Sequence, residues 1–194
     1  IGWSYSDDNG ANWRTGGVHV VDAFWAASVV FTRLRAAYHE GQVLILTHWQ
    51  PDYTDGQGEP VTLAVDVWLQ LASDDDGATF QLVDSGLDHV SGNNPNAGPL
   101  QLRSEIVVDR ATGIFTVLYE YDPGSGANQL SYKRLGSPFE VLHNVSRTDI
   151  QAAPTLGAGI TDMTAWESEN GWLNFVFNTD DTFEGYYSRD GGST

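Results

Sequence analysis

Short runs of apolar and β-branched residues, separated by Gly, Asp, Asn and Pro, follow one another along the whole chain. Two of these runs, Val43–Leu46 and Ile114–Tyr119, are apolar with little alternation. Such runs are typical of strands in sheets that are buried on both faces. The pattern therefore predicts an all-β chain whose sheets stack on one another.

One polar pattern recurs and predicts tight turns between these strands. It reads Ser-x-Asp-x-Gly-x-x-aromatic at Ser6–Trp13 and at Ser73–Phe80, and a third copy begins at Ser188. The Ser and Asp side chains accept hydrogen bonds from backbone N–H groups, the Gly supplies a positive φ, and the aromatic residue begins the returning strand. The residues expected to form these hairpins are Ser6, Asp8, Gly10, Trp13, Ser73, Asp75, Gly77, Phe80, Ser188, Asp190 and Gly192.

The spacing of the copies predicts a repeat architecture. Ser6 and Ser73 are 67 residues apart, and Ser73 and Ser188 are 115 apart, so a further copy is expected near the midpoint. The segment Tyr132–Phe139 lies there, with Gly136 and Phe139 at the offsets of Gly77 and Phe80. We expect it to keep the turn geometry without the polar side chains. The intervals of 67, 59 and 56 residues suit one four-stranded propeller blade.

The period divides the chain into parts of an incomplete β-propeller with four-stranded antiparallel blades. The expected units are the end of a first blade (1–30), a second blade (31–92), a third blade (93–148) and a truncated fourth blade (149–194). In the second blade we expect strands at 35–38, 43–49, 61–72 and 79–83 and a loop at 51–60, and in the third a last strand at 139–142. A ring of six or seven blades needs roughly 360–420 residues. The chain is therefore expected to be a fragment of a longer polypeptide; pairing of two half-rings is the alternative.

The repeated turns resemble those of the Asp-box (BNR) β-propellers, a sialidase-like superfamily of hydrolases, lectins and structural modules. The resemblance covers the whole chain and implies that the box turns are structural and lie on the face opposite the ligand site. It also implies an arginine cluster at the ring axis in the enzymes of the family. The faint match at Phe31–Leu34 to their aromatic-Arg-Ile-Pro signature lacks the proline.

Charge and composition limit the partners. There are 26 acidic and nine basic residues, so the formal net charge is −17, which argues against nucleic acid and anionic membrane as partners. The sequence has no cysteine, and its five histidines lack metal-ligand spacing, so we expect neither a metal nor a cofactor. The resemblance suggests an extracellular, cell-surface or virion-surface location.

The candidate ligand-binding residues lie on the face opposite the boxes. Arg35 and Arg103 fall where inner strands are expected to begin, and guanidinium groups bind carboxylates bidentately; they could equally pair with the abundant acids. Trp49 and Tyr53 beside Asp52 form an aromatic–carboxylate loop of the kind that stacks on sugar rings, although Trp49 could instead pack between blades. The ligand-binding set is Trp49, Asp52, Tyr53, His89 and Arg103.

Two functions stay open at this point. The favoured one is a non-enzymatic module of a larger surface or secreted protein that acts as a scaffold or recognises glycans, completed by further blades of the same polypeptide or another copy. The alternative is a sialidase-like exo-glycosidase fragment, for which Arg35, Arg103 and Glu120 are the candidate catalytic residues. Glu105 and Tyr119 have the chemistry to act as acid or nucleophile.

Overall fold

Regular structure over the described residues is almost entirely β-strand. The computed structural model describes residues 2–6, 8, 10–17, 29–54, 60–62, 65–89, 101–121, 129–150, 160–179 and 183–189. Within these ranges the exception is one turn of 3-10 helix, Leu142–Asn144. Every strand pairing among them is antiparallel. The prediction of an all-β chain is confirmed.

The strands form four successive sheets. The first contains β1 (Gly2–Tyr5) and β2 (Arg14–Gly17). The second contains β3 (Val29–His39), β4 (Gln42–Thr54), β6 (Val65–Ser73) and β7 (Gln81–His89), with β5 (Pro60–Thr62) paired to the end of β4. The third contains β8 (Gln101–Val108), β9 (Phe115–Tyr121), β10 (Gln129–Leu135) and β11 (Thr148–Asp149). The fourth contains β12 (Ile160–Glu167), β13 (Leu173–Thr179) and β14 (Phe183–Ser188).

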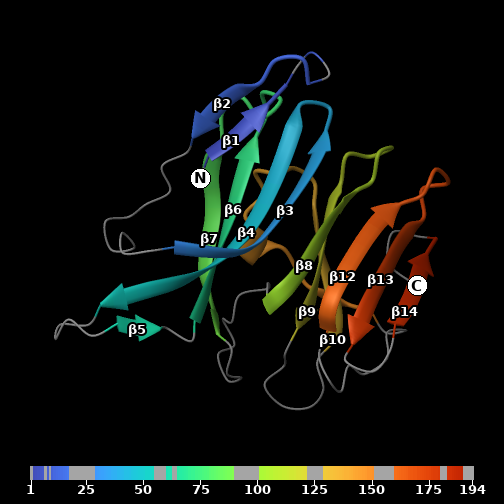
Figure 1. Cartoon of the computed structure of the whole chain (residues 1–194). Coiled ribbons are helices and arrows are strands. Elements are labelled where there is room, and N and C mark those ends of the chain that lie inside the picture. The colour runs from blue at the N-terminus through green and yellow to red at the C-terminus, as the bar shows by residue number, and fades with distance from the viewer. Residues whose placement is uncertain are drawn as a thin grey trace.

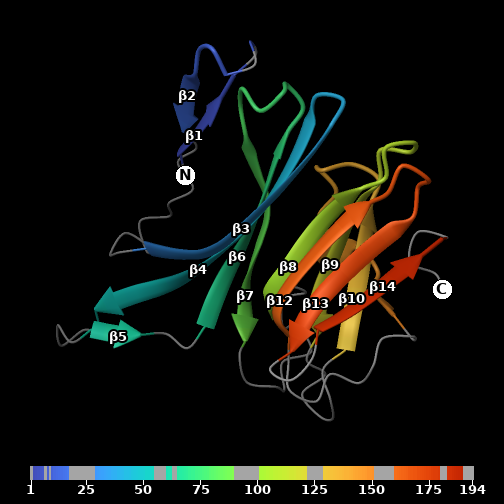
Figure 2. The ribbon, with the colours of Figure 1, turned by 45° about the vertical axis from the view of Figure 1, so that its right-hand side comes forward.

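The arrangement of these sheets is that of a partial β-propeller. In each sheet neighbouring strands follow one another along the chain, as in the blades of a propeller. The first strands of three successive sheets, β3, β8 and β12, are neighbours in space because β8 contacts both of the others. The sheets follow one another in chain order, with β1–β2 and β12–β14 at opposite ends (Figures 1 and 2). We therefore call β3, β8 and β12 the inner strands.

Side chains between neighbouring sheets form the core. Leu44, Leu46 and Trp68 of the second sheet pack with Phe115, Val117 and Tyr119 of the third. On the other face of the third sheet, Leu118, Leu130 and Tyr132 pack with Met163, Phe175 and Phe177 of the fourth. Successive residues of β9 therefore point alternately into two cores, which explains why Ile114–Tyr119 is apolar apart from Thr116.

The first two box turns have the same hydrogen bonds. In the second sheet the Ser73 hydroxyl accepts from the Gly77 N–H at 3.0 Å and donates to Asp75 Oδ1 at 2.7 Å. Asp75 in turn accepts from the Thr79 backbone N–H at 2.8 Å and from its hydroxyl at 2.6 Å. Ser6, Asp8, Gly10 and Asn12 repeat this arrangement. Both glycines have a positive φ, 87° at Gly10 and 82° at Gly77.

The aromatic positions of the boxes differ, and only part of the third box is described. Phe80 and Trp13 each lie against the glycine of their box, but Trp13 is 65% exposed whereas Phe80 is half-buried. Ser188 is buried at the end of β14. Asp190 and Gly192 lie outside the described residues. Position 4 after the box aspartate, Asn12 or Thr79, also takes part in the turn, which the motif did not predict.

The prediction of a further copy of the turn at Tyr132–Phe139 is wrong. Gly136 lacks a positive φ, and the segment 139–142, predicted as a strand, instead contains a turn and the start of the 3-10 helix. The edge strand of this sheet is β11, whose residues Thr148 and Asp149 pair with Tyr132 and Ser131. The hydrogen bonds of the box are replaced here by others, from the Gly136 N–H to Glu140 Oε2 and from the Phe139 N–H to the Ser137 hydroxyl, and the chain takes a longer route to the edge strand.

The second sheet extends further than its sequence indicates. Residues 51–54 and 60 of the loop predicted at 51–60 are strand, because β4 continues to Thr54 and pairs there with β5; residues 55–59 lie outside the described ranges. The inner strand predicted at 35–38 spans Val29–His39. A β-bulge in the β3–β4 ladder between Phe31 and Arg33 lets this longer strand bend. The far end of β4 with β5 accordingly diverges from the rest of the sheet (Figures 1 and 2).

Candidate functional site

The inner strands bring together one arginine and two carboxylates. Arg35 of β3 has its Nε 3.1 Å from Oε2 of Glu105 on β8. The Nη2 of the same guanidinium lies 4.0 Å from Oδ1 of Asp162 on β12. Each of three successive sheets thus contributes one charged side chain. We call Arg35, Glu105 and Asp162 the axial cluster.

Backbone groups hold the members of the axial cluster in place. The N–H of Ile106 donates to Glu105 Oε1 at 3.2 Å, and the N–H of Met163 donates to Asp162 Oδ1 at 2.9 Å. Arg35 Nη1 donates to its neighbour's carbonyl oxygen at 3.2 Å. Among the described residues the buried Nε–H of Arg35 does not have hydrogen-bond geometry toward any acceptor, so its contact with Glu105 is an ion pair.

The two carboxylates of the axial cluster differ in their surroundings. The side chain of Glu105 is 16% exposed, whereas that of Asp162 is 76% exposed. Burial raises the pKa of Glu105, although the Ile106 N–H and the Arg35 guanidinium counteract it, and the charge of Asp162 raises it further. Glu105 therefore retains a proton to higher pH than an ordinary glutamate does, beside a carboxylate in contact with water.

The axial cluster offers hydrogen-bond donors and acceptors in a protein whose inter-sheet contacts are mostly apolar. An arginine donates through a planar fork, and ionised carboxylates only accept. Together these groups can bind a ligand rich in hydroxyl groups. A carboxylic acid with a raised pKa next to a second carboxylate is also the combination used for general acid–base chemistry.

Arg35 and Arg103 do not occupy equivalent positions on their inner strands. Tyr38 pairs with Val43 in the second sheet and Val108 pairs with Phe115 in the third, each at the same end of its ladder. Three residues earlier on the inner strands stand Arg35, opposite Leu46, and Glu105, opposite Leu118. Arg103 lies within the bulge between Gln101 and Ser104. Arg103 therefore lies before the regular part of its ladder, whereas Arg35 lies within the regular part of its own.

The other predicted ligand-binding residues lie on strands. Trp49, Asp52 and Tyr53 belong to β4, and His89 is the last residue of β7. Their side chains, like that of Arg103, lie outside the described part of the structure. Glu120 belongs to β9 and is 5% exposed, so it lies in the interior rather than on the inner strands. Tyr119 is a core residue.

Asp162 is the member of the axial cluster that the sequence analysis missed. It lies near the start of β12, and a polar residue near the start of an inner strand is the feature by which the sequence could have indicated it.

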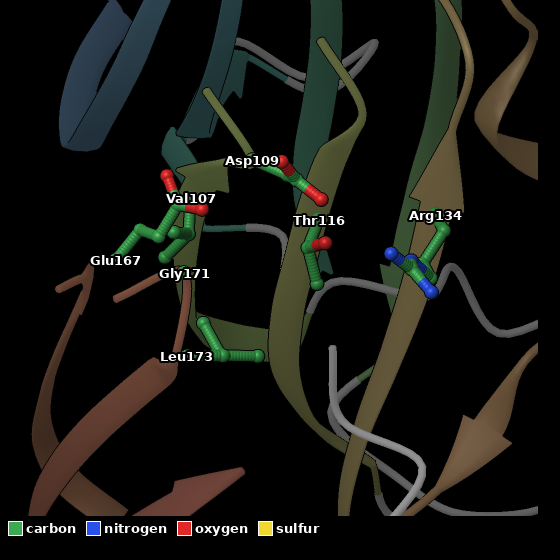
Figure 3. A pocket seen from close by; sticks show the side chains of 7 residues that line it. All are labelled: Val107, Asp109, Thr116, Arg134, Glu167, Gly171 and Leu173. Atoms are coloured by element: carbon green, nitrogen blue, oxygen red, sulfur yellow. The ribbon is translucent and has the colours of Figure 1, made fainter. Parts of the chain in front are cut away.

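A small cavity of about 20 Å³ lies between the third and fourth sheets (Figure 3). It is lined by Val107, Asp109, Thr116, Arg134, Glu167, Gly171 and Leu173. The Nε of Arg134 is buried without a hydrogen-bond partner in the described structure. This volume accommodates about one water molecule, so the cavity is too small to receive a substrate.

The described residues include no group of three or more His, Cys, Asp and Glu side chains that could hold a metal ion. Nor does any helix among them have the length and apolar character required to cross a membrane.

Comparison with known proteins shows the fold. No model of a known protein family and no curated protein sequence matches the chain. The chain is similar to the solved structure of a Penicillium chrysogenum α-L-arabinanase complexed with arabinobiose, with 11% identity and a TM-score of 0.54 over 98% of this chain and 52% of that chain. It is also similar to a Fusarium graminearum GH93 α-L-arabinofuranosidase with arabinobiose, with 16% identity and a TM-score of 0.53 over 96% and 54%. A second structure from that fungus, an α-L-arabinofuranosidase with an iminosugar inhibitor, gives 16% identity and a TM-score of 0.55 over 97% and 54%.

These similarities establish the architecture. The chain spans about half the length of the solved structures that it matches. The partial β-propeller predicted from the repeat is confirmed.

Proposed function

We propose that this chain is part of a carbohydrate-binding β-propeller and that the axial cluster contacts the sugar. The observation that carries the proposal is the convergence of Arg35, Glu105 and Asp162 from three inner strands. Propellers of this fold include two whose structures contain arabinobiose. Sugar hydroxyls both donate and accept, so a guanidinium flanked by carboxylates provides complementary partners.

The test is binding of arabinobiose and of a panel of other disaccharides to the intact protein, measured by titration calorimetry. Arg35→Ala is expected to weaken binding by about tenfold or more, because a hydrogen bond from a charged group is lost. Arg147→Ala is the matched control, since Arg147 pairs with Asp149 on the outer edge of the third sheet, with 2.8 Å between Nε and Oδ1. Equal effects of both substitutions, or no binding of any sugar, would contradict the proposal.

Hydrolysis of the bound sugar is the second candidate function, and the raised pKa of Glu105 favours it. In this reading Glu105 gives a proton to the leaving oxygen, and Asp162 is the second carboxylate. Glu105→Gln in the intact protein should then abolish turnover and leave binding within a few-fold of the unsubstituted protein. Binding without turnover in the unsubstituted protein would instead assign the chain to a non-enzymatic module.

The proposal also covers the class of propeller, the rest of the ring and the location of the protein. We place the chain among Asp-box propellers, because two turns share the same Ser–Asp–Gly hydrogen bonds. Further blades, from the same polypeptide or from another copy, would complete the ring, and the blade limits 1–30, 31–92, 93–148 and 149–194 would be the repeating units. We propose a secreted or surface location, either of a cell or of a virion, which fractionation of the source material would test.

A further inference from the structure

A second cavity lies at the end of the inner strands that faces the box turns. Its volume is about 230 Å³, and it is lined by residues at the ends of β3, β8 and β12. The N–H of Asp76 in the β6–β7 box turn donates to the Gly41 carbonyl in the β3–β4 turn at 2.9 Å. The cavity and the box turns therefore share one side of the molecule, the side that the Asp-box resemblance leaves without a ligand.

Two aromatic side chains flank this cavity. Tyr38 belongs to β3 and Trp166 to β12, and their side chains are 60% and 47% exposed. The Tyr38 hydroxyl donates to Asp76 Oδ1 at 2.9 Å, which holds that side chain in place. Ile106 and Val108 of β8 line the cavity between them. Aromatic rings on either side of an apolar floor suit a flat ligand with apolar faces.

The remaining lining residues include one group of each charge. Glu167 Oε2 accepts the backbone N–H of Arg110 at 2.9 Å, which fixes the carboxylate beside the arginine. Both side chains belong to the lining. The cavity thus offers a donor and an acceptor without a net charge, which suits a ligand that both donates and accepts hydrogen bonds.

We propose that this cavity is a second carbohydrate site, which binds one neutral sugar ring between Tyr38 and Trp166 with its hydroxyl groups on Arg110 and Glu167. It is separate from the axial cluster and rests on the proposed function only for the class of ligand. A sugar ring combines apolar faces with hydroxyl edges, as these walls require. The volume is below the roughly 300–1,000 Å³ of pockets for drug-sized ligands, which limits the occupant to a single ring.

The experiment uses the intact protein with free L-arabinose, D-galactose and D-glucose as probes, measured by saturation-transfer NMR and calorimetry. Trp166→Ala is expected to weaken binding of the preferred sugar by about tenfold or more. Arg110→Ala, an exposed substitution, should weaken it several-fold without affecting the fold. Phe183→Ala is the matched control, because Phe183 is a 77% exposed aromatic residue elsewhere on the fourth sheet.

The outcomes separate this site from the axial cluster. Arg35→Ala should leave binding in the cavity unchanged. Sugar binding that is lost with Trp166→Ala and shows no dependence on Arg35 would therefore contradict the proposed function and not this one. The second site is overturned if Trp166→Ala and Arg110→Ala leave the affinity for all three sugars unchanged. It is equally overturned if Trp166→Ala lowers the melting temperature and Arg110→Ala has no effect on binding, since Trp166 then packs against other parts of the protein.

Discussion

The turn that follows β6 and the segment that follows β10 both lead to the last strand of their sheets, but different hydrogen bonds hold them in place. In the second sheet, residues 74–80 are held by hydrogen bonds to Ser73 and Asp75, no more than four residues away. In the third sheet, residues 136–147 are held in part by side chains of the second sheet. Gln70 Nε2 donates to the carbonyl oxygens of Pro138 and Glu140, both at 2.8 Å, and its Oε1 accepts the Leu142 N–H at 3.1 Å.

A second contact ties the same segment to the second sheet. Asp84 of β7 accepts the backbone N–H of His143 at 2.9 Å and lies 2.9 Å from the Nδ1 of its ring. From within the third sheet, Lys133 Nζ donates to the Leu142 carbonyl at 2.9 Å. The loss of a local motif is therefore offset by contacts between sheets. A blade that lacks the box depends on its neighbour for its last turn.

Of the substitutions that test this difference, Gln70→Leu should have the largest effect on the free energy of unfolding. Gln70 is fully buried, and Gln70→Leu would leave two carbonyl oxygens and one N–H in the interior without partners. We expect a loss of about 3 kcal/mol in the free energy of unfolding in urea. The matched control is Gln81→Leu at an exposed position of β7, which should change it by about 0.5 kcal/mol at most. Similar values for the two variants would show that the segment does not depend on the second sheet.

Asp84→Ala should have the next largest effect on the free energy of unfolding. Asp84→Ala deletes an acceptor for His143 and the negative charge that faces Lys133, whose pKa burial already lowers. The expected loss is about 2 kcal/mol in the same measurement, and Asp84→Asn, which keeps one acceptor oxygen, should cost less. The control is Asp74→Ala, an exposed position in the box turn. If Asp84→Asn and Asp84→Ala were equally destabilising, the charge and not the hydrogen bond would account for the effect.

The same contrast explains how much of the fold the sequence could predict. The box turns follow from residues within eight positions of one another, so Ser73–Phe80 predicts its own geometry. The apolar run at Ile114–Tyr119 likewise predicts a strand buried on both faces. The path of residues 136–149 depends on Gln70 and Asp84, which lie more than 50 residues away in the sequence. The residues of this segment alone do not indicate those contacts, and the prediction of a tight turn followed by a strand at 139–142 was wrong.

The candidate site shows a similar limit. Arg35 and Glu105 were both identified as polar residues on inner strands, but their pairing depends on strand register. The bulge at Gln101–Ser104 takes Arg103 out of the regular ladder, and a bulge leaves little trace in a single sequence. The position of Arg103 was misjudged for this reason. Asp162 belongs to the site because β12 of the fourth sheet lies beside β8 of the third.

Ser73→Ala should break the local turn with a smaller and more confined effect. The Ser73 side chain is buried, and the substitution removes the acceptor of the Gly77 N–H. We expect a loss of about 1 kcal/mol in the free energy of unfolding. Hydrogen exchange should accelerate at residues 74–80 and remain unchanged at 136–147, whereas Gln70→Leu should accelerate exchange in the latter segment. Faster exchange in both segments after Ser73→Ala would contradict the local character of the box turn.

The smallest expected effect is a pH dependence that belongs to the box turn alone. Hydrogen bonds from the Thr79 hydroxyl and backbone, and from Ser73, lower the pKa of Asp75 to about 2. Because the folded state favours the ionised carboxylate, its contribution to stability is present above the ordinary pKa of 3.8 and is lost as the pH falls from there toward 2. Asp75→Asn lacks this titration, so the difference in urea midpoint between the two proteins should be constant at neutral pH and shrink below about pH 4.

Asp75 is exposed to solvent, which screens its charge and keeps the difference small. Asp74→Asn is the control, since no hydrogen bond of the turn uses that side chain. A difference that stays constant down to pH 2 would show that the aspartate holds the turn through its shape and not through its charge.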